Sequence, residues 1–171
     1  ASYGSTPLFH IDKITPEAKN LKLDKIDSID VKTIGKSEFH ALKSSFGNKG
    51  DKVDVVVFAA PQLSIVEMQK VADLCNKNTF KVPVIVCTSP QVYSDALRMG
   101  FVKKIESSGA KVLEGTCFYN QYAREIGEAN GWKRLLSNST KIVNILGGYG
   151  YEPLLANMEV CINSAVTGEL V

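Results

Sequence analysis

The stretch Val53-Asp-Val-Val-Val-Phe-Ala-Ala60 decides the fold class of this chain. From Val55 to Ala60 every residue is apolar, with no alternation of polar and apolar side chains. Such a pattern is typical of a strand that is buried on both faces of a parallel sheet. Pro61-Gln62-Leu63 follows, and Ser64 with Glu67 then forms the S-x-x-E pattern that opens a helix. The sequence therefore predicts a buried strand over 53–60, a turn, and a helix from Ser64 to about residue 76.

The same unit of strand, polar turn and helix recurs towards the C-terminus. Further strands are expected over residues 82–87, 111–116, 133–137 and 154–156. Helices are expected over residues 89–107 (broken at Gly100), 122–126, 138–146 and 158–166. This alternation predicts an α/β fold with a mostly parallel sheet of four or five strands flanked by helices.

Residues 1–52 are expected to carry shorter elements ahead of the repeated units of 53–171. The patterns favour a strand over 7–11, a turn or helix opened by Thr15, a half-exposed strand over 28–34 and a helix over 37–46. No linker rich in Pro, Ser or Gly separates the two parts, so we expect residues 1–171 to form a single α/β domain. Because the chain begins with Ala1 and not with Met, we also expect it to be a segment of a larger protein.

The composition argues against several classes of protein. With 171 residues, of which 44% are hydrophobic, the chain is long enough to bury one sizeable core. Its 20 Lys and Arg against 18 Asp and Glu leave a net charge of +2, so we expect no nucleic-acid partner. The longest apolar run, residues 55–61, is too short to cross a bilayer, and we expect a cytoplasmic protein without membrane contact.

The four cysteines lie far apart, without a C-x-x-C pair, which argues against a zinc ribbon or a redox dithiol. Cys87 and Cys117 each come at the end of a predicted strand in neighbouring units, so both are expected at one edge of the sheet, within reach of one metal or cluster. The alternative for each is a small buried hydrophobe, which is also what we expect of Cys75 and Cys161. Two thiolates do not complete an iron–sulfur or zinc site, so further ligands would be needed.

Small polar residues follow the predicted strands at their carboxyl ends, where ligands bind in open α/β sheets. Thr88 and Ser89 follow one strand, and Asn138 and Ser139 follow another. Hydroxyl groups beside the N–H groups of a helix start favour a carboxylate or a phosphate. Helix capping explains the same serines without any ligand.

His10 is a candidate for acid–base work, because it ends a predicted strand close to carboxylate residues. A structural histidine is the alternative. The chain contains no G-x-S-x-G, P-loop or G-x-G-x-x-G motif. The sequence alone therefore leaves the reaction open.

Six segments in order resemble the C-terminal half of the aconitase X large subunit. They are Leu8-Phe9-His10 with Thr15-Pro16-Glu17-Ala18, Ala60-Pro61-Gln62-Leu63-Ser64, Val84-Ile-Val-Cys87-Thr88-Ser89, Gly115-Thr116-Cys117, Ser137-Asn138-Ser139, and Cys161-Ile-Asn-Ser-Ala-Val-Thr-Gly168. The resemblance covers nearly the whole chain. It implies an aconitase-like α/β domain in a dehydratase that uses an iron–sulfur cluster to remove water from a small hydroxy acid, such as 5-phosphomevalonate or cis-3-hydroxy-L-proline.

Carried over to this sequence, the resemblance implies that Cys87 and Cys117 are cluster ligands. It also implies that the substrate's carboxylate or phosphate is held by Thr88, Ser89, Asn138 and Ser139. Two positions depart from the family pattern: Ala60-Pro61-Gln62 stands where the family has Cys-Pro-His, and Lys13 stands where a glycine is usual.

The resemblance further implies partners, because the family's large subunit is more than twice as long as this chain. The remaining half of that subunit would supply a third ligand, and a small swivelling domain, separate or fused, would complete the enzyme. Two alternatives of another class are open: a cluster-free α/β domain that binds a small anion without catalysis, and a flavodoxin-like regulatory module. The second lacks the expected acidic cluster at a strand end.

Overall fold

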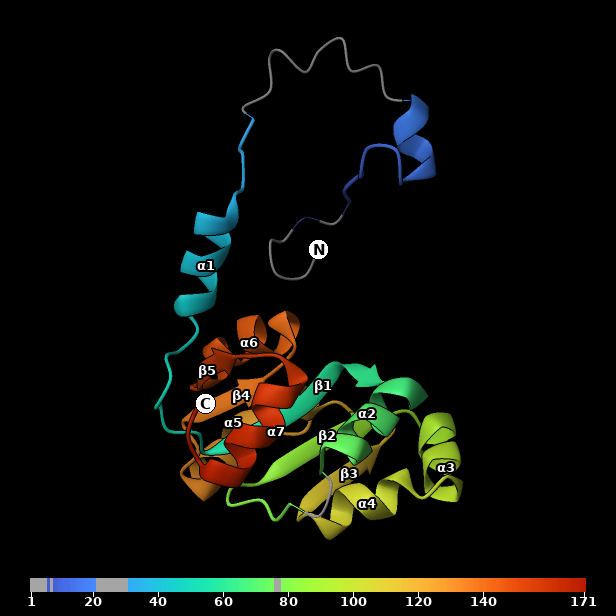
Figure 1. The fold of residues 1–171 in the computed structure, drawn as a ribbon, viewed down its shortest axis with the longest axis vertical. Coiled ribbons are helices and arrows are strands. Elements are labelled where there is room, and N and C mark those ends of the chain that lie inside the picture. The colour runs from blue at the N-terminus through green and yellow to red at the C-terminus, as the bar shows by residue number, and fades with distance from the viewer. Residues whose placement is uncertain (1–5, 7, 21–30, 76–77) are drawn as a thin grey trace. The chain divides into compact units, whose positions relative to one another are not determined.

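The computed structural model describes residues 6, 8–20, 31–75 and 78–171 of the chain. These residues fall into two units, Ala1–Leu42 and Lys43–Val171. The second unit holds a five-stranded sheet with helices on both of its faces (Figure 1). The predicted α/β class is therefore confirmed.

The five strands lie in the order β3-β2-β1-β4-β5, and every neighbouring pair is parallel. Their bounds are β1 (Val55–Leu63), β2 (Val84–Thr88), β3 (Ala110–Glu114), β4 (Arg134–Ser137) and β5 (Glu152–Leu155). From β1 the chain adds β2 and β3 on one side, and it then crosses to add β4 and β5 on the other side. The strand order therefore reverses between β1 and β4, which is the topological switch point of the sheet.

Two apolar layers cover the sheet, one on each face. The first layer packs on Val56 and Phe58 of β1 and contains residues from α2 (Ile65–Cys75), α3 (Pro90–Arg98), α4 (Phe101–Ser107) and α7 (Met158–Thr167). The second packs on Val55 and Val57 and contains residues from η3 (Phe118–Asn120), α5 (Ala123–Asn130) and α6 (Thr140–Leu146). Both faces of β1 are thus buried, which explains its unbroken apolar sequence.

Local signals in the sequence set several helix ends. The backbone N–H and the hydroxyl of Ser64 both donate to Glu67 Oε2, over 2.8 and 2.7 Å, so the predicted capping box before α2 is confirmed. Gly100 has φ +79°, a left-handed conformation that favours glycine, and it separates α3 from α4 as predicted. After α6 the chain forms a 3₁₀ turn, η4 (Gly147–Tyr149), before it enters β5.

The end of β1 differs from the prediction. Residues 61–63 were expected to form a turn, but β1 continues through them to Leu63, which pairs with Thr88 of β2. The register is irregular between Phe58 and Leu63, Ala60 has φ +46°, and the Ala60–Pro61 peptide is cis. The hydroxyl of Thr88 donates to the carbonyl oxygen of Leu63 over 2.6 Å, and this long-range bond holds the segment at the carboxyl edge of the sheet.

The first unit contains the 3₁₀ turn η1 (Pro16–Asn20), and α1 (Lys36–Ser44) spans the boundary between the two units. Both elements agree with the prediction. The predicted strands do not: residues 8–11 and 31–34 have no regular structure, while Pro7 and residues 28–30 lie outside the described residues. A strand needs a neighbour to pair with, and none of the described residues pairs with either segment.

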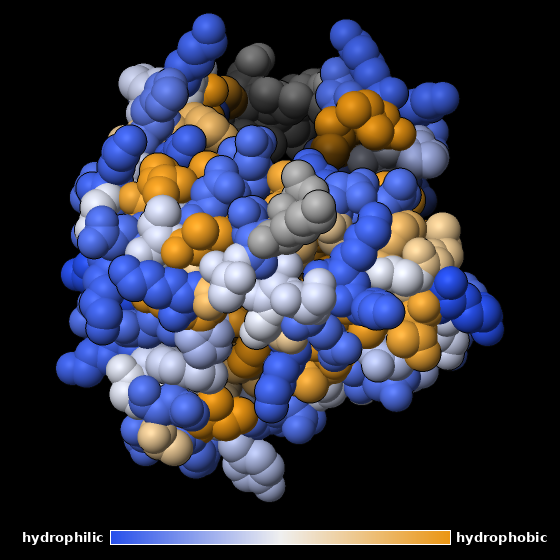
Figure 2. Space-filling model, turned by 60° about the horizontal axis from the view of Figure 1, so that its bottom comes forward, coloured by the Kyte–Doolittle hydropathy of each residue, from blue (hydrophilic) through white to orange (hydrophobic). Residues whose placement is uncertain are grey.

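No helix among the described residues is long and apolar enough to cross a bilayer. On the face shown in Figure 2, hydrophobic residues are scattered among hydrophilic ones. Val66, Leu97 and Met99 are examples of large apolar side chains that are exposed. Such a mixture is ordinary for a protein surface.

Candidate functional site

A cavity of about 330 Å³ lies at the carboxyl ends of β1 and β4, where the strand order reverses. We call it the switch-point pocket. It is lined by residues 59–61 and Leu63 of β1, by Glu67 of α2, and by residues 138–141, which include the first two residues of α6. The helices after β1 and β4 belong to opposite apolar layers, so they diverge and leave a crevice. Ligands of open α/β sheets bind at such a position.

Two of the predicted substrate-binding residues, Asn138 and Ser139, line this pocket. The hydroxyl of Ser139 donates to the carbonyl oxygen of Ala60 over 2.6 Å and accepts from the backbone N–H of Ile142 over 3.3 Å. Ser139 is thus the N-cap of α6 and joins the two walls of the pocket at the same time. The structure gives it a structural role, whereas its role towards substrate stays a prediction.

The other two predicted residues, Thr88 and Ser89, do not line the pocket. Thr88 is completely buried, and its hydroxyl is used by the carbonyl oxygen of Leu63. Ser89 is the N-cap of α3, where its hydroxyl oxygen accepts from the backbone N–H of Val92 over 3.2 Å. Their hydroxyl groups therefore satisfy the backbone at the end of β2, and the expectation that they hold substrate stays a prediction.

The two cysteines at the ends of β2 and β3 lie near enough for the charge of one to act on the other, and their role as ligands stays a prediction. Cys87 is completely buried in β2, while Cys117 is partly buried just before η3. Burial raises the pKa of the Cys87 thiol to about 11; the charge of the nearby Cys117 also raises it, and a hydrogen bond from the Phe118 backbone N–H lowers it. Neither cysteine lines the switch-point pocket, although Ala60, which lines it, packs in the same apolar layer as Cys87.

The donor set fits part of an iron–sulfur site. Thiolates are the usual ligands of such clusters, and Cys87 and Cys117 supply two of them. Within the described ranges, no three His, Cys, Asp or Glu side chains are grouped so as to hold a metal ion. Cys75 and Cys161 belong to the opposite apolar layer, as packing residues do, and burial raises the pKa of their thiols to about 11 and about 12. A complete site would need ligands from another part of the protein.

His10 is an exposed residue of the first unit, in a segment without regular structure. The structure does not place it relative to the pocket, so its acid–base role stays a prediction. Lys13, which stands where the family usually has glycine, adopts φ +62°. Glycine takes up that left-handed conformation without strain. Lys13 therefore replaces the usual glycine at a backbone position whose left-handed conformation favours glycine.

Three residues near the pocket were missed by the sequence reasoning. Gln62 donates through Nε2 to the carbonyl oxygen of Thr116 over 2.9 Å, and so joins the end of β1 to the segment after β3. Glu67 and Lys141 line the pocket. Glu67 was recognised as a capping residue alone, and a lysine in the first turn of a helix gives no sequence signal for a ligand. The Ser137-Asn-Ser-Thr-Lys141 run, which ends a strand, was the available indication.

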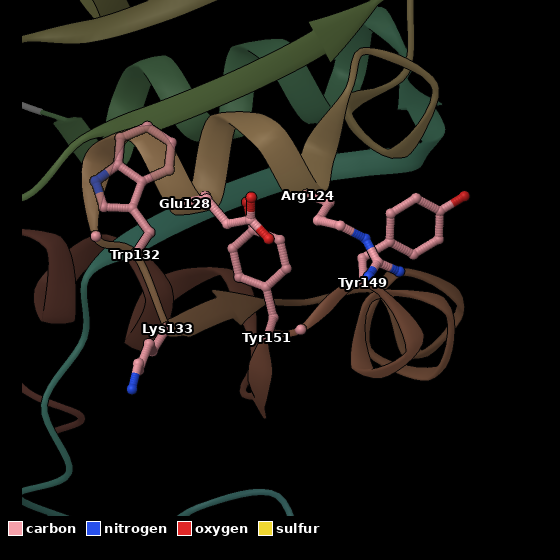
Figure 3. Close-up of a pocket in the computed structure, with 9 residues that line it drawn as sticks. Arg124, Glu128, Trp132, Lys133, Tyr149 and Tyr151 are labelled. Atoms are coloured by element: carbon pink, nitrogen blue, oxygen red, sulfur yellow. The ribbon is translucent and has the colours of Figure 1, made fainter.

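A second cavity, of about 270 Å³, lies between α5 and the segment from η4 to β5 (Figure 3). Arg124, Glu128 and Trp132 line it from the α5 side, and Tyr149 and Tyr151 line it from the other. Arg124 donates to the carbonyl oxygen of Gly148 over 3.0 Å. This cavity borders the segments that enter β4 and β5, away from the edge where open α/β sheets bind ligands. The switch-point pocket is therefore the stronger candidate site.

Curated relatives are similar in sequence to this chain over most of its length. The chain, however, spans only about two fifths of the relatives' own length or less. The phosphomevalonate dehydratase large subunit of Thermococcus kodakarensis is 26% identical over 95% of this chain and 40% of its own length. The corresponding subunit of Methanocaldococcus jannaschii is 29% identical over 82% of this chain and 34% of its own length. Cis-3-hydroxy-L-proline dehydratase of Hypocrea jecorina is 25% identical over 98% of this chain and 29% of its own length.

A solved structure has a similar fold. The crystal structure of Thermococcus kodakaraensis aconitase X (holo-form) superimposes with a TM-score of 0.65 at 20% sequence identity, over 83% of this chain and 37% of that one. Residues 53–167, the repeated βα units, match the sequence model described as the aconitase X third domain. That match covers more than half of the chain, and its sheet carries the switch-point pocket and the cysteine pair. The chain therefore belongs to the aconitase X family.

Proposed function

We propose that this chain is part of a dehydratase, a hydro-lyase that removes water from a small hydroxy acid. The observation that carries the proposal is the pocket at the switch point of the sheet, lined by Asn138 and Ser139, in a member of the aconitase X family. Curated relatives of this chain are named as dehydratases. The pocket is of the size that small organic ligands occupy.

The substrate is proposed to be a hydroxy acid of the kind that the relatives' names give, 5-phosphomevalonate or cis-3-hydroxy-L-proline. Each carries a carboxylate, and the first carries a phosphate as well. Asn138 and Ser139 line the pocket in which such a group would lie. Thr88, Ser89 and His10 remain candidates for contacts that form only in the complete protein.

An iron–sulfur cluster is proposed as the cofactor, with Cys87 and Cys117 as two of its ligands. When bound, an iron with an open position acts as a Lewis acid on the oxygens of the substrate. The proximity of the two thiols and their place at the carboxyl edge of the sheet support this assignment. Burial raises the pKa of the Cys87 thiol to about 11, so binding of iron, which needs the thiolate, would have to displace its proton, and the N–H of Phe118, which donates to Cys87, would assist this.

The complete enzyme is proposed to need more protein than this chain. Its relatives are large subunits more than twice as long, so the remaining part of such a subunit is the first partner. A small swivelling domain, separate or fused, is the second. Location in the cytoplasm is part of the same proposal. A cluster-free domain that binds a small anion is the alternative.

Anaerobic iron and sulfide analysis, with a visible spectrum of the complete protein, tests the proposed function. We expect bound iron and sulfide in the wild type, loss of both in Cys87→Ser and Cys117→Ser, and retention in Cys75→Ala, which removes a thiol from the opposite layer. Assays with the two hydroxy acids then identify the substrate. Absence of a cluster from the complete wild-type protein would reject the cofactor and favour the anion-binding alternative.

A further inference from the structure

Lys141 is a partly buried lysine that has no carboxylate partner among the described residues. In the part of the chain that the structure describes, the partly buried Lys and Arg residues are Arg134 and Lys141. Arg134 has two acidic partners, Asp51 at 3.2 Å and Glu152 at 3.3 Å. None of the ion pairs among these residues includes Lys141. The residue as a whole is partly buried and its charge is not used in an ion pair among the described residues, so its ammonium group is available to an anion.

The surroundings of Lys141 place its charge at the switch-point pocket. The residue is one of those that line the cavity. Its Nζ atom lies 5.9 Å from the centroid of the Tyr119 ring, within the range of a cation–π contact. Tyr119 belongs to η3, the turn that directly follows Cys117. The ammonium group and the cysteine pair are therefore linked through one short segment at the carboxyl edge of the sheet.

The other charged residue that lines the pocket, Glu67, forms hydrogen bonds with Ser64. Its Oε2 atom accepts two hydrogen bonds from Ser64, at 2.8 and 2.7 Å, and these bonds cap α2. The walls that come from β1 are apolar, since Ala59, Ala60 and Leu63 form them together with a proline. Lys141 is thus the cation that the described residues offer to a negatively charged ligand in this cavity.

We propose that Lys141 binds an oxyanion of a small molecule, a carboxylate or a phosphate, in the switch-point pocket. This inference rests on the proposed function, because it assigns the anionic end of the hydroxy acid to a particular side chain. Lys141 is then a substrate-binding residue that fixes which end of the substrate enters the pocket. Asn138, which lines the same cavity, is placed to add an uncharged donor.

Binding of two probes to the full chain tests the proposal. Inorganic phosphate and lactate are titrated separately while amide chemical shifts of residues 59–60 and 138–141 are followed by NMR. We expect saturable shifts with at least one probe, weakened about tenfold or more in Lys141→Met, because a charge-assisted hydrogen bond is lost. The preferred probe tells which oxyanion the pocket selects.

Two variants control the experiment. Lys103→Met removes the same charge from an exposed position on α4, and we expect its affinity to equal that of the wild type. Lys141→Arg keeps the charge and is expected to retain most of the binding, which separates loss of charge from loss of fold. Equal weakening in Lys103→Met, or unchanged affinity in Lys141→Met, would overturn the proposal.

The experiments distinguish failure of the proposed dehydratase function from failure of the proposed role of Lys141. If the probes bind through Lys141 while the complete protein dehydrates neither hydroxy acid, the inference stands and the proposed reaction fails. If the complete protein is a dehydratase whose KM is unchanged in Lys141→Met, the reaction stands and the inference fails. Absence of any saturable binding of either probe would also overturn the inference.

Discussion

The hydroxyl of Ser139 and the carbonyl oxygen of Ala60 are joined by a hydrogen bond of 2.6 Å between residues 79 positions apart in the chain. The bond crosses the switch point of the sheet, because Ala60 belongs to the end of β1 and Ser139 precedes α6. The same hydroxyl oxygen caps α6 by accepting from Ile142. A side chain that the sequence indicates only as a helix cap thus also joins two residues that line the pocket.

Replacement of this hydroxyl should cost more than the loss of a cap. Ser139→Ala removes the cap and leaves the carbonyl oxygen of Ala60, in a buried residue, without this donor. We expect the free energy of unfolding to fall by about 2 kcal/mol, of which about 1 kcal/mol is the cap. Urea unfolding of the wild type and of Ser139→Ala measures this change in the free energy of unfolding.

Ser89→Ala is the matched control for this substitution. Ser89 caps α3 through a similar bond to Val92, and that is the hydrogen bond its hydroxyl makes among the described residues. We expect a loss of about 1 kcal/mol. If the two variants lose the same stability, the bond from Ser139 to Ala60 contributes nothing, and its proposed role in holding the pocket is wrong.

Two buried threonine hydroxyls should respond oppositely to removal. The Oγ1 atom of Thr116 is buried and has no hydrogen-bond partner among the residues that the structure describes, whereas that of Thr88 donates to the carbonyl oxygen of Leu63. Thr116→Val removes an unsatisfied group, so we expect the stability to stay unchanged or to rise by up to about 1 kcal/mol. Thr88→Val leaves the carbonyl oxygen of Leu63 without this donor and should cost about 1–3 kcal/mol. Urea unfolding of both variants checks this contrast, and a clear loss in Thr116→Val would show that its hydroxyl has a partner.

The fold of residues 53–171 was predictable because its signals are local. The apolar run of β1 and the Ser64–Glu67 capping box act within a few residues, and both appear in the structure as expected. The end of β1 was not predictable, because residues 61–63 join the strand through the pairing of Leu63 with Thr88 in β2. The strands predicted from short patterns within residues 1–52 were wrong over residues 8–11 and 31–34, because a strand forms only where a neighbouring strand pairs with it.

The site was predictable in the same partial way. Small polar residues at strand ends indicated Asn138 and Ser139, because the carboxyl ends of parallel strands share one edge. The strand order, which makes β1 and β4 neighbours, was not available from the sequence, so the pocket between them could not be assigned. Lys141 lies over the ring of Tyr119, which belongs to a turn more than twenty residues away, and no local sequence pattern indicates this contact.

Gly127 of α5 should tolerate no side chain. A Cβ atom at this position would lie 2.6 Å from the hydroxyl oxygen of Tyr151, which itself donates to the carbonyl oxygen of Ala123 over 2.6 Å. Tyr151 lies below α5 in Figure 3, in the buried part of that cavity wall. We expect Gly127→Ala to lower the free energy of unfolding by about 1–3 kcal/mol, despite the higher helix propensity of alanine.

Gly148→Ala is the control for Gly127, because a Cβ atom there meets nothing within 4 Å. We expect its stability to match or slightly exceed that of the wild type. Thermal unfolding of both variants measures the difference. A stable Gly127→Ala protein would mean that α5 can move away from Tyr151, in which case the cavity of Figure 3 is not rigid.

Asp54 should make the stability depend on pH in the acid range. Burial raises the pKa of its carboxyl group, but hydrogen bonds from the backbone N–H groups of Arg134 and Lys133 and the charge of Lys52 outweigh this and hold the pKa below its ordinary value of 3.8. Because the folded state has the lower pKa, the charged carboxylate stabilises the fold above the ordinary value, and this stabilisation is lost as the pH falls through the folded-state pKa. Its Oδ2 atom binds both N–H groups at 2.9 Å and so joins β1 to the start of β4.

Asp54→Asn should therefore be less stable than the wild type near neutral pH, with a difference that shrinks as the pH falls below the ordinary carboxyl pKa. Urea unfolding over that pH range measures both proteins. Asp73→Asn is the control, since Asp73 is exposed and lies 3.8 Å from Lys104, a pair that contributes little in water. It should follow the wild type at every pH. A constant difference between Asp54→Asn and the wild type down to the acid limit would show that the lost interaction is not that of the charged carboxylate.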